Sequence, residues 1–247
     1  MTLIIGFLTV TFSVLGGYVL SHGYLSALWQ PYELLVILGA ATGALVIANP
    51  PHVLKAVRKG FPQLLKKTGH DRQAYLEILS VMYELFMRSR RGGMLTLESH
   101  VEDPDESYIF QQYSRLLADH HYAITFLTDY LRLMVGGNMN SFELDNLMDI
   151  EIATHEHETA QPAYALASMA DGLPGFGVVA AVMGIVITMA SLDGPVDQTG
   201  QHLAAALVGT FLGILLSYGF VGPFASAMRH ISEDEATGSL LLEGENT

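Results

Sequence analysis

The polar side chains that could assist the movement of an ion lie in two long apolar runs near the C-terminal end of the chain. The first run is DGLPGFGVVAAVMGIVITMAS, from Asp171 through Pro174 to Ser191, and the second is AAALVGTFLGILLSYGFVGP, which ends at Pro223. Hydroxyl groups in such runs can hydrate a path through a membrane, or they can bond back to helix carbonyls and across helices. The hydroxyls in question are those of Thr188, Thr210, Ser217 and Tyr218.

No Asp, Glu, Lys, Arg or His lies inside either run or inside the two apolar runs at the N-terminal end. Glu33, Asp171 and Asp193 stand only at the edges of these runs. An ionisable group within a membrane is costly and usually marks an ion or substrate path. Either the protein moves no ion, or it forms the wall of a path whose titrating group belongs to a partner.

The remaining polar residues do not form a recognisable catalytic or metal site. His155-Glu156-His157 lacks the HExxH spacing that places two imidazoles on one helix face, and His120 and His121 diverge around a helix. No nucleophile, base and orienting group occur together, and no glycine-rich phosphate loop precedes a basic residue. We therefore expect no enzymatic activity, no metal and no cofactor.

A charged stretch, MRSRRGGMLTLESH from Met87 to His100, places basic residues before a glycine break and an acidic residue after it. Such a cluster on a helical domain can be a solvated face, or it can be a docking surface for a charged partner.

The composition identifies the elements that must hold these residues. The chain has 247 residues, of which 50% are hydrophobic and only 15% are charged, whereas soluble domains have about 25% charged residues. The net charge of −13 argues against a nucleic-acid partner, and the absence of cysteine excludes disulfides and thiol chemistry. Because the apolar residues come in runs long enough to cross a bilayer, we expect an integral membrane protein.

The fold class predicted is all-α, with four transmembrane helices and a cytoplasmic helical domain between the second and the third. The first helix should cover Leu3 to Leu20 as a retained span, because the N-terminus lacks the basic region of a signal peptide. The second should cover Glu33 to Asn49. The expected divisions are 1–50 for spans one and two, 51–170 for the cytoplasmic domain, 171–230 for spans three and four, and 231–247 for a cytoplasmic tail.

Helical spacing of apolar residues recurs within the polar middle of the chain. It predicts amphipathic helices over Ala74–Phe86 and Ile109–Met134, with turns at Gly92-Gly93 and Gly136-Gly137. Tyr24, Trp29 and Tyr32, between the first two spans, suit the lipid headgroup layer.

The positions of the basic residues predict the orientation. All 12 lie in the long insertion or just after the fourth span, at Arg229, and none lies in the short loops or the first span. By the positive-inside rule, the insertion and both termini are cytoplasmic.

Several dispersed motifs, in order, resemble the MotA family of flagellar motor stator subunits across nearly the whole chain. They are QPYELLVILGAATG, MRSRRGGMLTLESHVEDP, YLRLMVGGNMNSFELDNLMDIEIATHE, LPGFGVVAAVMGIV and LVGTFLGILLSYGFVGP. The resemblance implies a pentamer in the bacterial inner membrane, surrounding two helices of a peptidoglycan-anchored MotB partner. In that family the partner contributes the aspartate that binds and releases the coupling ion. The resemblance ends before the family's C-terminal segment, which can include assembly contacts, because this chain stops at Thr247.

The resemblance also implies roles for seven residues. Pro174 and Pro223 match the two prolines that couple ion passage to movement, and Thr210 and Tyr218 match positions at the ion path and the partner interface. Arg90 and Glu98 match the charges that engage the rotor protein FliG. Ala181 stands where sodium-driven relatives carry a threonine, and because a methyl group cannot ligate Na⁺, we expect protons as the coupling ion.

Two alternative functions remain open from the sequence. One is an energising subunit of the ExbB or TolQ type, although those relatives have three spans in a different order. The other is a scaffold in contact with membrane lipids that assembles a complex without conducting ions.

Overall fold

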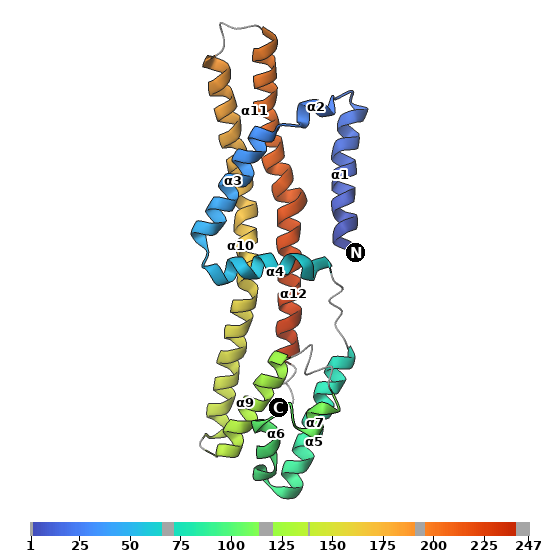
Figure 1. Ribbon diagram of the computed structural model, residues 1–247, viewed down its shortest axis with the longest axis vertical. Helices are drawn as coiled ribbons and strands as arrows, with labels where there is room; N and C mark the ends of the chain where they lie inside the picture. Colours follow the sequence, from blue (N-terminus) through green and yellow to red (C-terminus); the bar gives the residue numbers. More distant parts are fainter. Residues whose placement is uncertain (1, 66–71, 114–120, 138, 191–195, 241–247) are drawn as a thin grey trace. The chain divides into compact units, whose positions relative to one another are not determined.

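A computed structural model describes residues 2–65, 72–113, 121–137, 139–190 and 196–240. Within these ranges all regular structure is helical, and the long helices account for most of the chain (Figure 1). The elements are α1 (Thr2–Leu20), α2 (Leu25–Leu28), α3 (Pro31–Ala48), α4 (Pro51–Leu65), α5 (Arg72–Gly92), η1 (Met94–Leu97), α6 (Glu98–Glu102), α7 (Tyr108–Gln111), α9 (His121–Gly136), α10 (Ser141–Ala190), α11 (Val196–Leu216), η2 (Ser217–Val221) and α12 (Gly222–Leu240).

Four helical stretches are long and apolar enough to cross a membrane. They are Thr2–Leu20, Leu25–Ala48, Ser141–Ala190 and Gly200–Glu233. The all-helical class with four spans, predicted from the apolar runs, is confirmed. The third stretch belongs to α10, a helix of 50 residues that contains both Pro162 and Pro174. At about 1.5 Å per residue, such a helix is far longer than a bilayer is thick.

The described chain divides into two compact units, and α10 contributes residues to both. Unit 1 consists of Met1–Thr68 and Ala160–Ile231, and unit 2 consists of Gly69–Thr159 together with the segment from Ser232. Unit 1 thus includes α4 and residues 160–170 of α10, both of which lie within the predicted 51–170 division. The helix α4 belongs to unit 1 because it packs against α10 and α12.

In unit 1, α4 crosses α10 and α12 and packs against both (Figure 1). Its apolar side contributes Val53 and Val57 to a cluster with Leu166 of α10 and Phe224 of α12. Leu3, at the start of the first span, and Leu45, near the end of the second, pack against the same cluster. Because those two span ends lie on one side of a membrane, α4 lies at that boundary, with Lys55, Arg58 and Lys59 on its exposed side.

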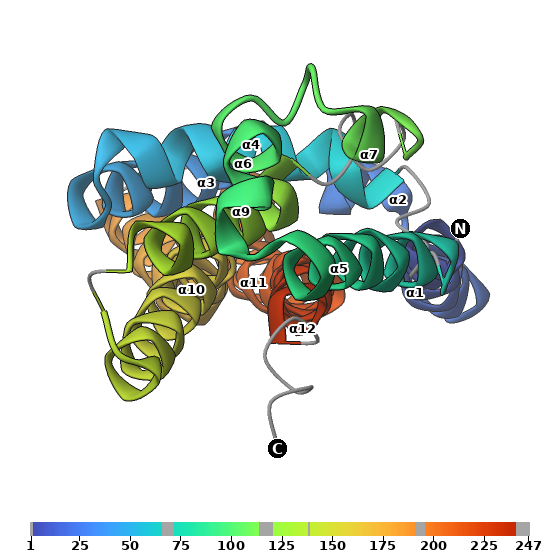
Figure 2. The same cartoon turned by 90° about the horizontal axis from the view of Figure 1, so that it is seen from below.

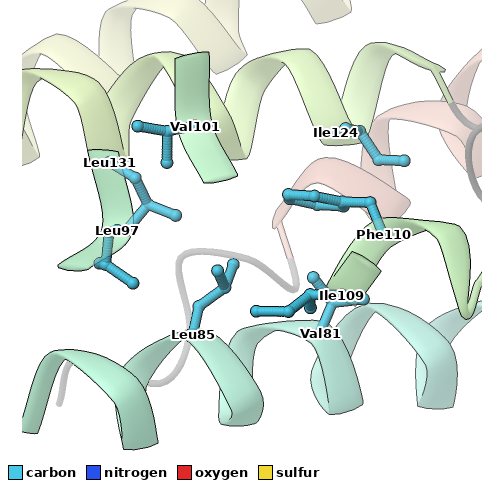
Figure 3. Packing of buried hydrophobic residues seen from close by; sticks show 8 residues of the cluster. All are labelled: Val81, Leu85, Leu97, Val101, Ile109, Phe110, Ile124 and Leu131. Carbon is cyan, nitrogen blue, oxygen red and sulfur yellow. The ribbon is translucent and has the colours of Figure 1, made fainter. Parts of the chain in front are cut away.

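Unit 2 has a core formed by short and long helices together (Figure 3). In it, α6 lies against α9 (Figure 2). Arg132 of α9 donates to the carbonyl oxygen of Val101 at 2.8 Å and to Glu102 Oε1 at 3.0 Å. The buried side chains of this core are Val81, Leu85, Leu97, Val101, Ile109, Phe110, Ile124 and Leu131. A second cluster joins α9 to α10 through Phe126, Tyr130 and Ile152.

The helix expected over Ile109–Met134 is wrong as a single element. In the described part, α7 ends at Gln111 and α9 begins at His121. Ile109 and Phe110 are both buried although they are adjacent in sequence, because α7 is a single turn enclosed by other helices. The apolar residues between Ile109 and Met134 therefore belong to two separate helices, α7 and α9, each with its own packing surface.

Both predicted glycine turns are present. Gly93 and Gly137 have positive φ values of 84° and 63°, a conformation that side chains disfavour. Gly93 allows the chain to reverse between α5 and η1.

A wide helical turn, η2, interrupts the fourth span. The N–H of Gly222 donates to the carbonyl oxygen of Ser217, five residues earlier, where an α-helix would use four. Pro223 follows directly, and since proline has no N–H to donate, the altered bonding pattern occurs where regular bonding would fail anyway.

Candidate functional site

The third and fourth spans, α10 and α11, meet along a seam of small residues. A Cβ atom added to Gly213 would lie 2.8 Å from the Cα of Gly177 and 2.8 Å from the carbonyl oxygen of Leu173. A Cβ added to Gly184 would lie 2.9 Å from the Cβ of Ala206. The two backbones are therefore too close for larger side chains at these positions. Small residues permit such an approach between membrane helices.

Ala181 and Thr210, two of the predicted path residues, both lie at this seam. The backbone nitrogen of Ala181 lies 3.5 Å from where a Cβ added to Gly209 would be. The Cα of Thr210 lies 3.4 Å from where a Cβ added to Gly177 would be. Both side chains are partly buried in the isolated chain. The structure thus brings together two residues that are far apart in the sequence.

Residues close in sequence to Pro174 and to Tyr218 belong to one apolar cluster. Leu173, next to Pro174, is fully buried in this cluster, and the partly buried Leu216 and Val221, which lie before and after Tyr218 in the sequence, pack against it. Tyr218 itself is 72% exposed. Its ring therefore extends away from the packed hairpin, as a contact with a partner would require.

Pro223 occupies the second position of α12 and is exposed. Its neighbours Phe224 and Ala225 are buried in the cluster that includes α4. The two prolines predicted for coupling therefore lie in different parts of unit 1. Pro174 lies in the hairpin of the third and fourth spans, and Pro223 lies next to residues that pack with α4.

The hydroxyl of Thr188 bonds back to a carbonyl of its own helix, which is the second of the two roles that the sequence left open for it. Its Oγ1 donates to the carbonyl oxygen of Gly184 at 2.7 Å, which is the back-bonding expected of threonine in a helix.

Glu33 is an acidic residue whose position the sequence did not reveal. It lies in the first turn of α3 within the candidate span Leu25–Ala48. Its Oε2 is buried and has no hydrogen-bond partner among the described residues. Its Cγ is 3.5 Å from the Cβ position of Gly209, at the seam.

In unit 2, the predicted docking charges Arg90 and Glu98 lie on either side of the Gly93 turn. Arg90 is in the last turn of α5, and Glu98 is the first residue of α6. Both are exposed. Neither forms a salt bridge with any residue that the structure describes. Both charges are therefore available to another protein.

Contacts around the buried side chain of His100 hold the segment that carries these charges. The Nδ1 of His100 and the Oγ of Ser107 are 2.9 Å apart and hydrogen-bonded. The Tyr108 ring packs edge-on against His100, with centroids 5.2 Å apart, and the Arg88 guanidinium lies 4.7 Å from the centre of the same ring. Burial first, and then the positive charge of Arg88, lower the pKa of His100 below its usual value. The neutral imidazole is therefore favoured.

Leu95, between the two docking charges, was missed by the sequence reasoning. It is 75% exposed, whereas Leu97 in the same short helix is fully buried. The two leucines are only two residues apart in a helix of four residues, so the sequence pattern could not show which of them is buried. An exposed leucine between opposite charges adds an apolar element to a docking surface.

A further titratable cluster joins α9 to α10. The rings of Tyr122 and His155 stack with centroids 3.6 Å apart, and the hydroxyl of Tyr130 donates to Glu151 Oε2 at 2.7 Å. Burial is the main cause that raises the pKa values of both tyrosines and lowers the pKa of His155, against the opposing effect of Glu158 on His155. His155 therefore packs as an aromatic ring. His120 lies outside the described residues, as do the side-chain surroundings of His121.

Taken together, the four apolar helices and the closely packed hairpin of the third and fourth spans define a multi-pass helical membrane protein. The side chains of α10 from Pro174 to Ala190 and of α11 from Leu203 to Leu216 include no ionisable group. Such a wall conducts an ion only together with other groups.

Comparisons with known proteins identify the family. The family described as Motility protein A N-terminal matches residues 4–93, and the MotA/TolQ/ExbB proton channel family matches residues 119–238. Motility protein A of Salmonella typhimurium is 46% identical over 234 residues, which cover 95% of this chain and 79% of that protein. The Escherichia coli protein of the same description is 44% identical with the same coverage.

Solved structures agree with these matches. The flagellar MotAB stator complex from Bacillus subtilis contains a chain that is similar with a TM-score of 0.71 at 27% identity, covering 98% of this chain and 89% of that one. A structure of C. jejuni MotAB, at 20% identity and a TM-score of 0.72, supports the fold.

The chain belongs to the motility protein A family. It is a channel-forming subunit of the stator of the flagellar motor, and it is not an enzyme. The match over residues 4–93 is to the motility branch, so the ExbB or TolQ alternative is excluded.

Proposed function

We propose that five copies of this chain surround two transmembrane helices of a peptidoglycan-anchored, MotB-type partner in the bacterial inner membrane. The naming of the solved relatives as MotAB complexes supports the partner. The location of all 12 basic residues after the second or fourth span supports cytoplasmic termini and a cytoplasmic unit 2. Membrane lipids cover the remaining apolar faces.

The coupling ion is a proton that binds to a carboxylate of the partner. Ala181 and Thr210 form part of the wall beside it, and the methyl group of Ala181 offers no ligand to Na⁺. Protonation removes the charge of the partner carboxylate, which changes its hydration and its contact with one wall subunit. Pro174, Pro223 and Tyr218 then transmit the change to the cytoplasmic side.

The energy available for each proton limits how the ring can work. One charge that crosses 100 mV supplies about 2.3 kcal/mol. Several crossings per step, or low friction, are therefore needed to turn a large rotor.

Rotor contact is assigned to Arg90 and Glu98, which we propose engage FliG through opposite charges. The support is their exposure and the buried contacts of His100 that hold their segment. Charged residues across an interface mainly set the specificity and the rate of association.

The observation that carries the proposal is the uncharged, glycine-packed hairpin of Gly177 and Gly213 in a chain of this family. The test is proton flux into vesicles that contain this chain alone or the chain with its MotB-type partner. We expect flux only with the partner, because the wall lacks a proton-binding group in its hairpin. Flux that is absent in both preparations would favour a non-conducting scaffold.

A further inference from the structure

Glu33 is placed where a carboxylate has no ordinary structural reason to be. It is partly buried in the first turn of α3, and its Oε2 is removed from solvent without a hydrogen-bond partner among the described residues. An acidic residue in the first turn is favoured by the helix dipole, and an exposed carboxylate satisfies that preference. The dipole does not account for an oxygen buried against a neighbouring helix.

The unpaired oxygen has a cost. A buried polar group left without a partner destabilises a protein by about 1–3 kcal/mol, and a charged one by more. A position that tolerates this cost is a candidate for a functional role.

Gly209 of α11 creates the space that Glu33 occupies. The Cβ position of Gly209 is 3.5 Å from the Cγ of Glu33, 3.3 Å from the Cβ of Ala180 and 3.5 Å from the backbone nitrogen of Ala181. Three helices therefore meet at this glycine, α3 with its carboxylate, α10 with the path residue Ala181, and α11 with Thr210 next in sequence. The carboxylate stem thus packs at the same junction as two path residues.

No other ionisable group faces Glu33 from the packed parts of these helices. The described residues of α10 from Pro174 onward and of α11 from Leu203 onward carry none. Tyr32 precedes it on α3 and is 79% exposed, and Tyr24 precedes α2. His202 and Asp197 lie further along α11 toward its start, and Asp193 lies outside the described residues.

We propose that Glu33 is a proton-accepting group of this chain at the outer end of the path, ahead of the partner's carboxylate. This inference rests on the proposed function and on its orientation, in which the start of α3 faces outward. A hydronium ion loses a proton to a carboxylate oxygen of Glu33, and a new O–H bond forms there. That bond breaks when the proton passes to water in the path, which restores the carboxylate.

The experiment uses the complex of this chain with its MotB-type partner, reconstituted in vesicles, with proton flux measured as the external pH is varied. Glu33→Gln keeps the shape and removes the proton-accepting carboxylate, whereas Glu33→Asp keeps a carboxylate. Tyr32→Phe, next to it, is the matched control. We expect a several-fold loss of flux and an altered dependence on external pH in Glu33→Gln, partial retention in Glu33→Asp, and parental behaviour in Tyr32→Phe.

The outcomes separate this inference from the proposed function. Partner-dependent flux in the parent complex, together with the same rate and pH profile in Glu33→Gln, would overturn the role of Glu33 and leave the stator function standing. Absence of flux in the parent complex would overturn both. If Glu33→Gln does not assemble with the partner, the pH profile of Glu33→Asp decides, because a residue of purely structural importance would leave that profile unchanged.

Discussion

His100 shows how one buried residue can make the docking segment sensitive to pH. Its ring is 7% exposed and hydrogen-bonded to Ser107, and burial together with Arg88 lowers its pKa from the usual 6.5. The folded state therefore binds a proton less readily than the unfolded state. The resulting stability is fully present above pH 6.5 and is lost as the pH falls through the lowered folded-state pKa.

We expect acidification from neutral pH to reduce hydrogen-exchange protection in α6 and α7 of the purified protein. His100→Gln, which stays neutral, should show a smaller change over the same pH interval. The measurement is local because His155, whose pKa is also lowered by burial, lies on α10. Equal losses of protection in the parent and in His100→Gln would show that the His100 proton is not responsible.

At the scale of elements, the contact between α10 and α11 depends on backbone proximity. Gly213→Ala would place a Cβ 2.8 Å from backbone atoms of both Gly177 and Leu173, and neither can move without shifting its helix. Overpacking of this kind costs about 1–3 kcal/mol. We expect a lower thermal unfolding temperature in detergent and weaker swimming.

Gly175→Ala is the matched control for this substitution. It adds the same methyl group to α10, but no atom of another helix lies within 4 Å of its Cβ position. Equal effects of the two substitutions would contradict the steric explanation.

The four spans could be predicted from the sequence because length and apolar composition alone decide them. The continuity of α10 could not, because Pro162 and Pro174 each remove a backbone donor and usually end or kink a helix. Packing on both sides of these prolines, rather than local preference, keeps the helix intact. The position of α4 was also hidden, since its partners Leu166 and Phe224 are more than a hundred residues away.

At the scale of the whole molecule, α10 supplies core residues to both units. Ile152 belongs to the core of unit 2, and Leu173 and Ala180 belong to that of unit 1. The two cores are nevertheless separate, and the docking charges lie in unit 2 whereas Ala181 and Thr210 lie in unit 1. A substitution of a docking charge should therefore leave the ion path intact while it changes the transfer of force to the rotor.

We expect Arg90→Glu to weaken swimming while proton flux with the partner in vesicles stays at the parental level. A compensating charge reversal on the rotor protein should restore swimming, because the proposed contact depends on opposite charges. Arg91→Glu is the control, since Arg91 is exposed beside it and has no assigned role. Harmless reversal of Arg90 would favour a solvated face.

The candidate site was predictable in part. Ala181 and Thr210 were assigned by resemblance, and the structure places them at one seam. Glu33 was interpreted as an edge residue, because a sequence does not show which side of a helix start faces a neighbour. The structure adds that its carboxylate is buried beside Gly209.

The wide turn η2 changes the direction in which the side chains of α12 point relative to those of α11. A turn that takes one extra residue advances the next helix by about 100° relative to an uninterrupted one. Phe224 and Ala225, which follow η2, pack in the cluster that includes Val53 of α4 and Leu166 of α10. The fourth span can therefore pack on its hairpin neighbour with one side before η2, and with a differently oriented side after η2 on the cluster that α4 and α10 form together.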